Sequence, residues 1–324
     1  MKIVIEPVPS GVAPGESPDA FLKDLQKEFK EHDIVEVSET ADQIREVADA
    51  EVYFGWPERE VFLAGEHLKW IHCPGTGIDR LIEIPELVQS DIPVTNAREP
   101  HVNPMADHVF GFMIAFAHKL HWMWDDQREK KWRMYDYAWK QVDLVGSTMG
   151  ILAFGNIGKA VAKRAAGFDI DVYAVDKYPQ DSPYAKEVWG LDKLDDMLAI
   201  SDWLVVTAPI TDETRGMIGP KELAKLKKDA FVVIISRGGI VDEYALAEAI
   251  KSGHLSGAGV DALEPEPPVP DNPLWTTENV LISPHASAFT RDLYLGRREV
   301  FRENLRRYLR GEDFLYVCDK KLGY

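Results

Sequence analysis

The stretch of residues 149–176 constrains the fold of this 324-residue chain more than any other. The apolar run 149–154 is typical of a buried parallel strand, and a glycine turn follows it at once. Gly155 and Gly158 begin a segment with helical apolar spacing, and a second apolar strand then ends at Asp176. These residues predict a strand, turn, helix and strand unit of a parallel α/β sheet.

The same unit has the features of a dinucleotide-binding turn. Backbone N–H groups at a helix N-terminus attract a pyrophosphate, and glycine lets the ligand approach the main chain. The carboxylate of Asp176 can accept from both ribose hydroxyls and would repel a 2′-phosphate, which predicts NAD as the cofactor. Ala153 replaces the usual first glycine, so the turn must accommodate a Cβ atom. Taken alone, this segment is also compatible with a tight turn in any α/β protein.

Alternating strand and helix patterns predict two α/β domains. We expect a doubly wound parallel (Rossmann) sheet domain, residues 98–291, inserted in a flavodoxin-like substrate-binding domain formed by 1–97 and 292–324. The predicted strands are 2–6, 34–37, 51–55, 70–73 and 93–95, then 149–154, 171–175, 203–207, 231–235, 256–260 and 280–283. The predicted helices include 19–32, 98–120, 157–168, 192–200, 219–227, 242–252 and 288–310. A crevice between the two domains is where a cofactor and a small substrate are expected to meet.

Composition excludes several classes of function. The net charge of −17 argues against nucleic acid or an anionic membrane as the main partner. No apolar run reaches the roughly 18 residues that a membrane span needs, and no signal peptide is apparent, so a cytoplasmic location is expected. Two cysteines are too few for a disulfide framework or a structural zinc site. The sequence shows no metal-binding cluster, and we expect no metal.

Residues 121–145 form an aromatic segment unlike its neighbours. It contains four tryptophans and two tyrosines with weak periodicity. Many large aromatic side chains without a clear buried face predict an arm that packs on another surface, as in a homodimer. A solvated loop with a few core anchors is the alternative.

Polar side chains follow three late strands of the second domain. Arg237 follows the fourth strand, Asp261 and Glu266 follow the fifth, and His285 follows the sixth. An arginine binds a carboxylate through a planar fork, and a histidine exchanges a proton near neutral pH. A carboxylate beside the histidine fixes its tautomer and favours imidazolium. These residues are suited to reduction of a 2-oxo acid.

Two features of the first domain point to a substrate. The turn Gly75-Thr76-Gly77 follows the fourth strand, where its backbone N–H groups can face an anion, although an ordinary strand-to-helix loop is an equal alternative. Trp56 ends the strand before it and could form a wall of the substrate pocket. A tryptophan of the core is an equally good interpretation of that residue.

With these motifs the sequence resembles the D-isomer-specific 2-hydroxyacid dehydrogenase family over essentially the whole chain. The matching stretches are Gly155-Asn156-Ile157-Gly158, Thr207-Ala208-Pro209, Asp212-Glu213-Thr214-Arg215, Ser236-Arg237-Gly238, Val241-Asp242, Gly259-Val260-Asp261, Glu266-Pro267, Asn272-Pro273-Leu274-Trp275 and Pro284-His285. Each motif is weakly specific alone, and together they are very specific.

The resemblance implies roles for individual residues. Arg237 would be the substrate-binding and catalytic arginine, Glu266 the catalytic glutamate and His285 the acid/base, whereas Glu264 is an alternative carboxylate with the wrong spacing. The implied cofactor-binding residues are Gly155, Asn156, Ile157, Gly158, Asp176, Thr207, Ala208, Pro209, Thr214, Ser236, Arg237, Asp261 and His285, with Asp261 at the nicotinamide carboxamide. The implied substrate-binding residues are Gly75, Thr76, Gly77, Arg237 and Trp56.

The activity implied is NAD-dependent hydride transfer between a small 2-oxo acid, such as glyoxylate or hydroxypyruvate, and its D-2-hydroxy acid. The aromatic segment 121–145 resembles the family's dimerisation arm. Another class of function on the same fold is a dinucleotide-sensing, corepressor-like interaction protein, which uses the nucleotide as a conformational switch.

Overall fold

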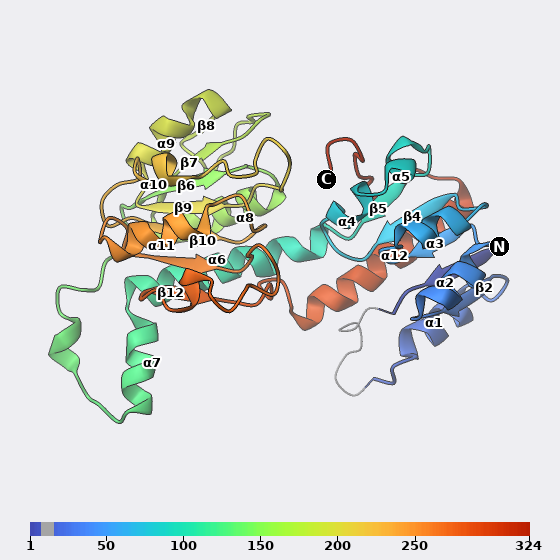
Figure 1. Cartoon of the computed structure of the whole chain (residues 1–324), viewed down its shortest axis with the longest axis horizontal. Helices are drawn as coiled ribbons and strands as arrows, with labels where there is room; N and C mark the ends of the chain where they lie inside the picture. Colours follow the sequence, from blue (N-terminus) through green and yellow to red (C-terminus); the bar gives the residue numbers. More distant parts are fainter. Residues whose placement is uncertain (8–15) are drawn as a thin grey trace. The chain divides into compact units, whose positions relative to one another are not determined.

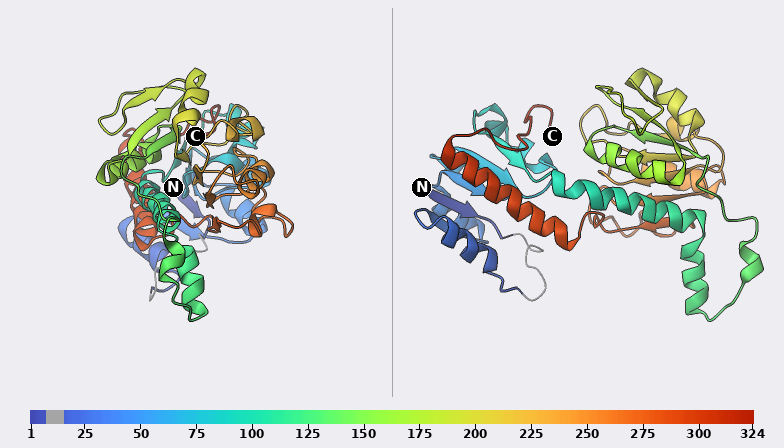
Figure 2. Two further views of the ribbon diagram at one scale, coloured as in Figure 1. Left: turned by 90° about the vertical axis from the view of Figure 1, so that its left-hand side faces the viewer. Right: turned by 180° about the vertical axis from the view of Figure 1, so that it is seen from behind.

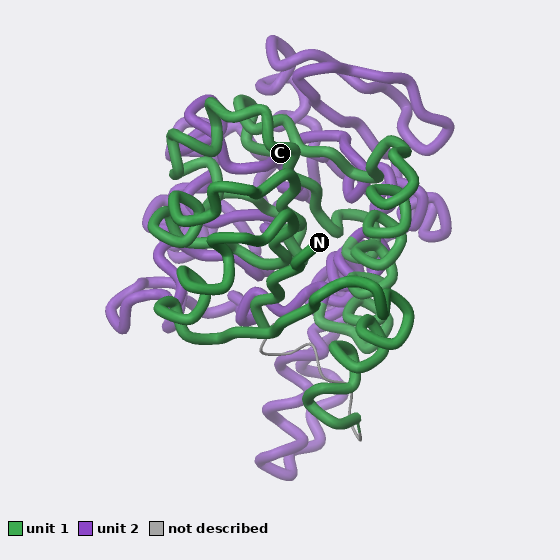
Figure 3. Tube along the Cα trace, turned by 90° about the vertical axis from the view of Figure 1, so that its right-hand side faces the viewer, with its two compact units in different colours: residues 1–101, 289–324 green, residues 102–288 purple. Residues whose placement is uncertain are grey.

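The computed structural model describes residues 1–7 and 16–324, and these form two compact units. The first unit contains Met1–His101 and Phe289–Tyr324, and the second contains Val102–Ala288 (Figure 3). The second unit is therefore inserted in the first, with boundaries that differ by a few residues from those expected. Residues 98–101 and 289–291, which were expected in the inserted domain, belong to the first unit.

Hydrogen bonds explain where the first boundary lies. The buried ring of His101 donates from Nδ1 to the Ala97 carbonyl at 2.8 Å, and Arg297 donates to its Nε2 at 2.7 Å. Arg297 lies on α12 (Arg291–Arg310), the long helix of the first unit. Residues 98–101 are thus attached to the first unit on both sides, and α6 (Val102–Ala117) begins the second unit.

The first unit is a five-stranded parallel sheet in the order β2-β1-β3-β4-β5, the flavodoxin-like order, as expected (Figure 1). Its strands are β1 (Lys2–Ile5), β2 (Asp33–Glu36), β3 (Val52–Phe54), β4 (Trp70–Cys73) and β5 (Val94–Asn96). Its shorter helices are α1 (Ala20–Glu28), α2 (Thr40–Val47), α3 (Arg59–Ala64), α4 (Asp79–Ile82), α5 (Pro85–Gln89) and η1 (Glu99–His101). Alternation along β1 separates two cores: Ile3 and Ile5 pack with α1 and α12, whereas Val4 packs with α2 and α3.

The C-terminal segment docks on the edge of this sheet. Val317 forms an antiparallel bridge with Thr95 beside β5, and the Cys318 N–H donates to the Val94 carbonyl at 2.8 Å. The end of the chain therefore belongs to the first unit, within the residues 292–324 expected there.

The second unit is a parallel sheet in the order β12-β11-β10-β9-β6-β7-β8. Its strands are β6 (Thr148–Leu152), β7 (Asp171–Val175), β8 (Glu187–Trp189), β9 (Trp203–Val206), β10 (Phe231–Ile234), β11 (Gly257–Val260) and β12 (Val280–Ile282). The helices that follow α6 in this unit are α7 (Leu120–Arg128), η2 (Met134–Tyr137), α8 (Asn156–Ala165), η3 (Ala166–Phe168), η4 (Leu191–Lys193), α9 (Leu194–Ile200), α10 (Pro220–Leu223), α11 (Glu243–Lys251) and η5 (Pro273–Trp275). The strand order reverses between β6 and β9, which is where doubly wound sheets bind their ligands.

The second unit contains one strand and one α-helix that the sequence did not predict. The sheet has seven strands instead of six, because the edge strand β8 pairs with β7 and Trp189 packs against Tyr173. Helix α7, which we did not expect, buries none of its residues, so it lacks the apolar period that identifies a helix from sequence.

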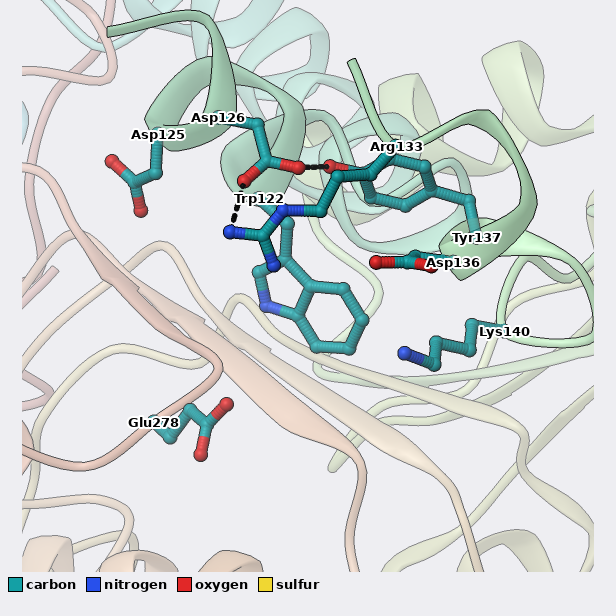
Figure 4. A pocket seen from close by; sticks show the side chains of 8 residues that line it. All are labelled: Trp122, Asp125, Asp126, Arg133, Asp136, Tyr137, Lys140 and Glu278. Carbon is teal, nitrogen blue, oxygen red and sulfur yellow. Dashed lines mark hydrogen bonds and ion pairs between the residues drawn. The ribbon is translucent and has the colours of Figure 1, made fainter. Parts of the chain in front are cut away.

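The arm, residues 120–145, projects from the sheet of the second unit (Figures 1 and 2). Asp126 connects α7 to the returning segment of the arm (Figure 4). Its carboxylate accepts from the Tyr137 hydroxyl at 2.7 Å and forms an ion pair with Arg133 at 3.2 Å. Trp122 anchors its base by donating to Asn279 at 3.0 Å. Along the residues that the structure describes, no helix is both long enough and apolar enough to cross a membrane.

Candidate active site

The glycine turn after β6 leaves open space at the N-terminus of α8. Ala153 adopts a left-handed backbone with φ of 71°, which carries the chain from β6 toward the helix. A Cβ atom on Gly158 would lie 2.6 Å from the Ala153 carbonyl oxygen, so this position requires glycine. A Cβ atom on Gly155, the N-cap of α8, would meet nothing within 4 Å. The turn therefore has an unobstructed helix N-terminus that fits a pyrophosphate.

Asp176 lies beside this turn, as the sequence spacing predicts. Its carboxylate accepts from the Phe154 N–H at 2.6 Å and from the Tyr178 N–H at 2.8 Å. These bonds fix the carboxylate at the end of β7 and leave further lone pairs for the hydroxyls of a ribose. The neighbouring Lys177 pairs with Glu213 at 2.6 Å, so part of its charge is compensated.

The other expected cofactor contacts lie at the ends of β9 and β10. Thr207 donates from its hydroxyl to the Ala153 carbonyl at 2.6 Å, and Ala208 after it is buried. The Thr214 hydroxyl donates to the Pro209 carbonyl at 2.6 Å and shapes the loop after β9. The Ser236 hydroxyl is buried, and among the described residues it has no hydrogen-bond partner. An unsatisfied hydroxyl at the end of β10 fits a bound polar ligand.

His285 and Glu266 form a hydrogen-bonded pair. Nδ1 of His285 lies 2.7 Å from Oε2 of Glu266, and the second carboxylate oxygen accepts from the Leu263 N–H at 3.1 Å. Glu264 instead pairs with Arg215, whose Nη1 lies 2.7 Å from both of its oxygens. Glu266, the carboxylate expected from the resemblance, is therefore the one that contacts the histidine, whereas the alternative Glu264 does not.

The carboxylate of Glu266 has a lowered pKa. Partial burial acts to raise this pKa, but the hydrogen bond and charge of His285 outweigh it, together with the Leu263 N–H and the charge of Arg237. Glu266 therefore remains ionised beside the imidazole at neutral pH.

Arg237 follows β10, and its positive charge contributes to the lowered pKa of Glu266. Its Nη1 donates to the carbonyl of Ser236 at 2.8 Å. A Cβ atom on the next residue, Gly238, would lie 2.1 Å from the Leu263 carbonyl carbon, so the two loops are in close contact. The structure thus brings together the three residues expected to be catalytic.

Asp261 holds the turn that carries His285. It is 2% exposed, and its carboxylate accepts from the Ala286 N–H, the Ser287 N–H and the Ser283 hydroxyl. Its own carbonyl accepts from the His285 N–H at 2.8 Å. The expected contact of Asp261 with a nicotinamide carboxamide stays a prediction, and its anchoring of the turn is an additional role.

Sequence reasoning missed one member of this network. Nε2 of His108, on α6, lies 3.0 Å from the hydroxyl of Ser283, which in turn donates to Asp261. Burial lowers the pKa of His108, with Asp261 acting against the shift, so the neutral ring is favoured. His108 lies far from Ser283 in sequence, so no local spacing connects it to the turn that carries His285.

In the first unit, Trp56 lies against the turn of residues 75–77. A Cβ atom on Gly75 would lie 2.8 Å from Cζ2 of Trp56, so the indole requires glycine there. The backbone N–H of Trp56 donates to Oε2 of Glu6 at 2.8 Å, and the Trp56 side chain also packs against the core of this unit. Trp56 thus contacts both the turn and the core, and its role in substrate binding stays a prediction.

Comparison with known proteins identifies the family. Residues 110–287 match the model of the D-isomer specific 2-hydroxyacid dehydrogenase, NAD binding domain. The chain is 36% identical over 248 residues to a D-3-phosphoglycerate dehydrogenase of Archaeoglobus fulgidus, covering 76% of this chain and 46% of the relative. It is 35% identical over 262 residues to a glyoxylate reductase of Korarchaeum cryptofilum, covering 79% of this chain and 77% of the relative.

A solved structure with the same fold is a D-isomer specific 2-hydroxyacid dehydrogenase from Xanthobacter autotrophicus in complex with NADPH and MES. It has a TM-score of 0.81 and 26% identity, and the match covers 100% of this chain and 99% of that one. The chain spans about half the length of the phosphoglycerate dehydrogenases that it matches. The family match coincides with the second unit, and the chain belongs to the D-isomer specific 2-hydroxyacid dehydrogenase family.

Proposed function

We propose that this protein is an NAD-dependent reductase that interconverts a small 2-oxo acid and the D-2-hydroxy acid by hydride transfer. The observation that carries the proposal is the His285–Glu266 pair, with Nδ1 and Oε2 2.7 Å apart. The pair lies at the carboxyl edge of the sheet whose strand β6 leads into the dinucleotide turn. An acid/base group on the same edge as a nicotinamide site suits carbonyl reduction.

The chain's own residues would perform three tasks. Arg237 would bind the substrate carboxylate through two parallel N–H donors and polarise the adjacent carbonyl. Protonated His285 would donate from Nε2 to the carbonyl oxygen during reduction and would take this proton back during oxidation. Glu266 would hold Nδ1 protonated, so that Nε2 faces the substrate. The nicotinamide, when bound, supplies or accepts the hydride.

In the first unit, we assign the turn of Gly75, Thr76 and Gly77 to the substrate carboxylate, through the Thr76 and Gly77 backbone N–H groups. Trp56, in contact with Gly75, would line the same subsite. A bulky indole favours a small substrate such as glyoxylate or hydroxypyruvate. The match to relatives named glyoxylate reductase supports this choice.

A panel of 2-oxo acids tests the proposal. NADH oxidation would be followed with glyoxylate, hydroxypyruvate, pyruvate and phosphohydroxypyruvate, and the highest kcat/KM is expected for one of the first two. Preference for phosphohydroxypyruvate would indicate a phosphoglycerate dehydrogenase, the name of other relatives. Tight NADH binding without turnover of any acid would favour the dinucleotide-sensing alternative.

Cofactor preference follows from Asp176. Its charge beside the Phe154 N–H would oppose a 2′-phosphate, so kcat/KM should be higher with NADH than with NADPH. Asp176→Asn, which keeps the hydrogen-bonding shape, should narrow this ratio. Equal use of both cofactors by the unmodified enzyme would contradict the assignment of Asp176.

We also propose that the arm mediates a homodimer. Trp132, Tyr135 and Trp139 are almost fully exposed, with relative exposures of 91%, 81% and 102%. A large exposed aromatic patch is characteristic of a protein–protein contact. The polar pocket at the arm's base adds charged groups for such a contact: Trp122, Asp125, Asp126, Arg133, Asp136, Tyr137, Lys140 and Glu278 line it (Figure 4). Light scattering should give a dimer mass, and Trp132→Ser with Trp139→Ser should shift it toward the monomer.

A further inference from the structure

The carbonyl groups of the turn 75–77 in the first unit all point into the protein. The Gly75 carbonyl accepts from the Ala97 N–H at 2.9 Å. The Gly77 carbonyl accepts from the thiol of Cys73 at 3.3 Å. The turn is thereby held at both ends by backbone and side-chain donors of the sheet.

The central carbonyl is held by a side chain. Nδ2 of Asn96, at the end of β5, donates to the Thr76 carbonyl at 2.6 Å. Nε of Arg98 donates to Oδ1 of the same amide at 2.8 Å, and its Nη2 donates to the Val317 carbonyl at 3.0 Å. Because an arginine can only donate, it fixes the carboxamide with its oxygen toward Arg98 and its NH₂ group toward the turn.

The direction of the carbonyls determines the direction of the N–H groups. In a trans peptide the carbonyl of one residue and the N–H of the next point in opposite directions. Inward carbonyls at Gly75 and Thr76 therefore turn the N–H groups of Thr76 and Gly77 away from the donors that hold the loop. Within the described part of the chain, neither N–H donates to a protein group. Two adjacent N–H groups held in this way form an anion-binding concavity.

We propose that Asn96, oriented by Arg98, is a positioning residue that aims the Thr76 and Gly77 N–H groups at the substrate carboxylate. The inference rests on the proposed function, because it takes the carboxylate of a 2-oxo acid as the anion. Asn96 is 2% exposed and therefore acts only through the turn that it holds. Arg98 connects this clamp to the C-terminal segment, since it also contacts the Cys318 sulfur.

The test compares two buried asparagines of the first unit. Asn96→Ala leaves the Thr76 carbonyl without its donor and frees the peptide plane to rotate. Asn304→Ala is the matched control, because Asn304 is fully buried and also binds backbone, donating to the Leu315 carbonyl at 3.0 Å and accepting its N–H at 2.7 Å. Both changes should lower the melting temperature.

Only the Asn96 change should alter substrate binding. For Asn96→Ala we expect KM for glyoxylate to rise about tenfold, equal to about 1.4 kcal/mol, with little change in the KM for NADH. The kcat should change by less than about threefold, since the proton donor is intact. Arg98→Met, which removes the donor that orients the Asn96 amide, should give a smaller rise in KM for glyoxylate. It tests the proposal even if Asn96→Ala does not fold. Equal KM values for Asn96→Ala, Arg98→Met and Asn304→Ala would overturn the proposal.

A binding experiment separates failure of the clamp from failure of the proposed function. Oxalate, an unreactive carboxylate with the shape of a 2-oxo acid, would be titrated into the ¹⁵N-labelled protein saturated with NADH. The Thr76 and Gly77 amide signals should shift in the wild type and in Asn304→Ala but not in Asn96→Ala. If the amide signals shift in this pattern but no 2-oxo acid is turned over, the proposed enzymatic activity is refuted and the positioning role of Asn96 is supported. Unmoved wild-type signals, or full shifts in Asn96→Ala, would refute the clamp.

Discussion

Replacing Glu266 by glutamine should move the pH dependence of catalysis in a direction set by the charge of its partner. The substitution keeps the size of the side chain and an acceptor for Nδ1 of His285, 2.7 Å from Oε2, but it removes the negative charge. Imidazolium is then harder to form. Reduction requires the protonated ring and should lose activity at a lower pH than in the wild type, whereas oxidation should persist to lower pH.

The size of this shift follows from the distance and exposure of the pair. Two unit charges about 4 Å apart attract by about 4 kcal/mol at an effective dielectric constant of about 20 and by about 1 kcal/mol in water. The side chains of His285 and Glu266 are 44% and 38% exposed, so solvent screens their charges and the lower value applies. About 1 kcal/mol corresponds to a shift of the pH profile by roughly 0.7 unit, because one unit is worth about 1.4 kcal/mol.

The assay is the pH profile of kcat/KM in both directions. Glu264→Gln is the control, because Glu264 pairs with Arg215 instead of the histidine, and its profiles should match those of the wild type. If the two variants exchanged these behaviours, the catalytic carboxylate would be Glu264. If neither profile moved, the reasoning from the His285–Glu266 contact would be refuted.

Three further predictions concern single residues. Arg237→Lys should raise KM for the oxo acid and lower kcat with little effect on NADH binding, because an ammonium lacks the two-pronged grip; near-normal kcat/KM would make the arginine structural. Ala153→Gly should raise the free energy of unfolding by about 0.5–1 kcal/mol in urea titrations, because φ of 71° disfavours a Cβ atom, and a decrease would contradict this. Burial lowers the pKa of His72 to about 3, below the roughly 6.5 of an unfolded histidine, so the unfolded chain binds more protons between these values. Stability should therefore fall by up to about 1.4 kcal/mol per pH unit below about pH 6, and His72→Gln should flatten this slope; an unchanged slope would contradict the prediction.

The sequence predicts the helices and strands whose buried residues leave a regular pattern of apolar side chains. Strands such as β9 and β10 are buried at every residue, so they are continuous apolar runs bounded by turns. Strand β8 escaped prediction because it is a short edge strand with no buried residue. The boundary near His101 escaped because it depends on Arg297, which lies far along the chain on α12.

The sequence could predict which turns carry the candidate site, but not which of their side chains contact one another. Chain order places Arg237, Glu266 and His285 after parallel strands, and parallel strands end at one edge of a sheet. The spacing from Asp261 favours Glu266 over Glu264, but the contact with His285 depends on the backbone of that loop, which spacing does not determine. The Asn96 clamp was equally hidden, since a donor that meets a carbonyl across two strands leaves no local pattern in the sequence.

Backbone strain links the two functional turns of the second unit. Ala153 and His285 both adopt a left-handed backbone, with φ of 71° and 51°, at positions where a Cβ atom makes that conformation unfavourable. Such strain persists only where surrounding contacts impose it. At His285 these contacts are the hydrogen bonds from the turn to Asp261. At Ala153 they are the hydrogen bond from the Thr207 hydroxyl to the Ala153 carbonyl and the one from the Ala153 N–H to the Val175 carbonyl. The proposed acid/base and the proposed dinucleotide turn are therefore held from behind by the buried Asp261 and the half-buried Thr207, so substitutions at Asp261 or Thr207 should impair the site without touching the substrate.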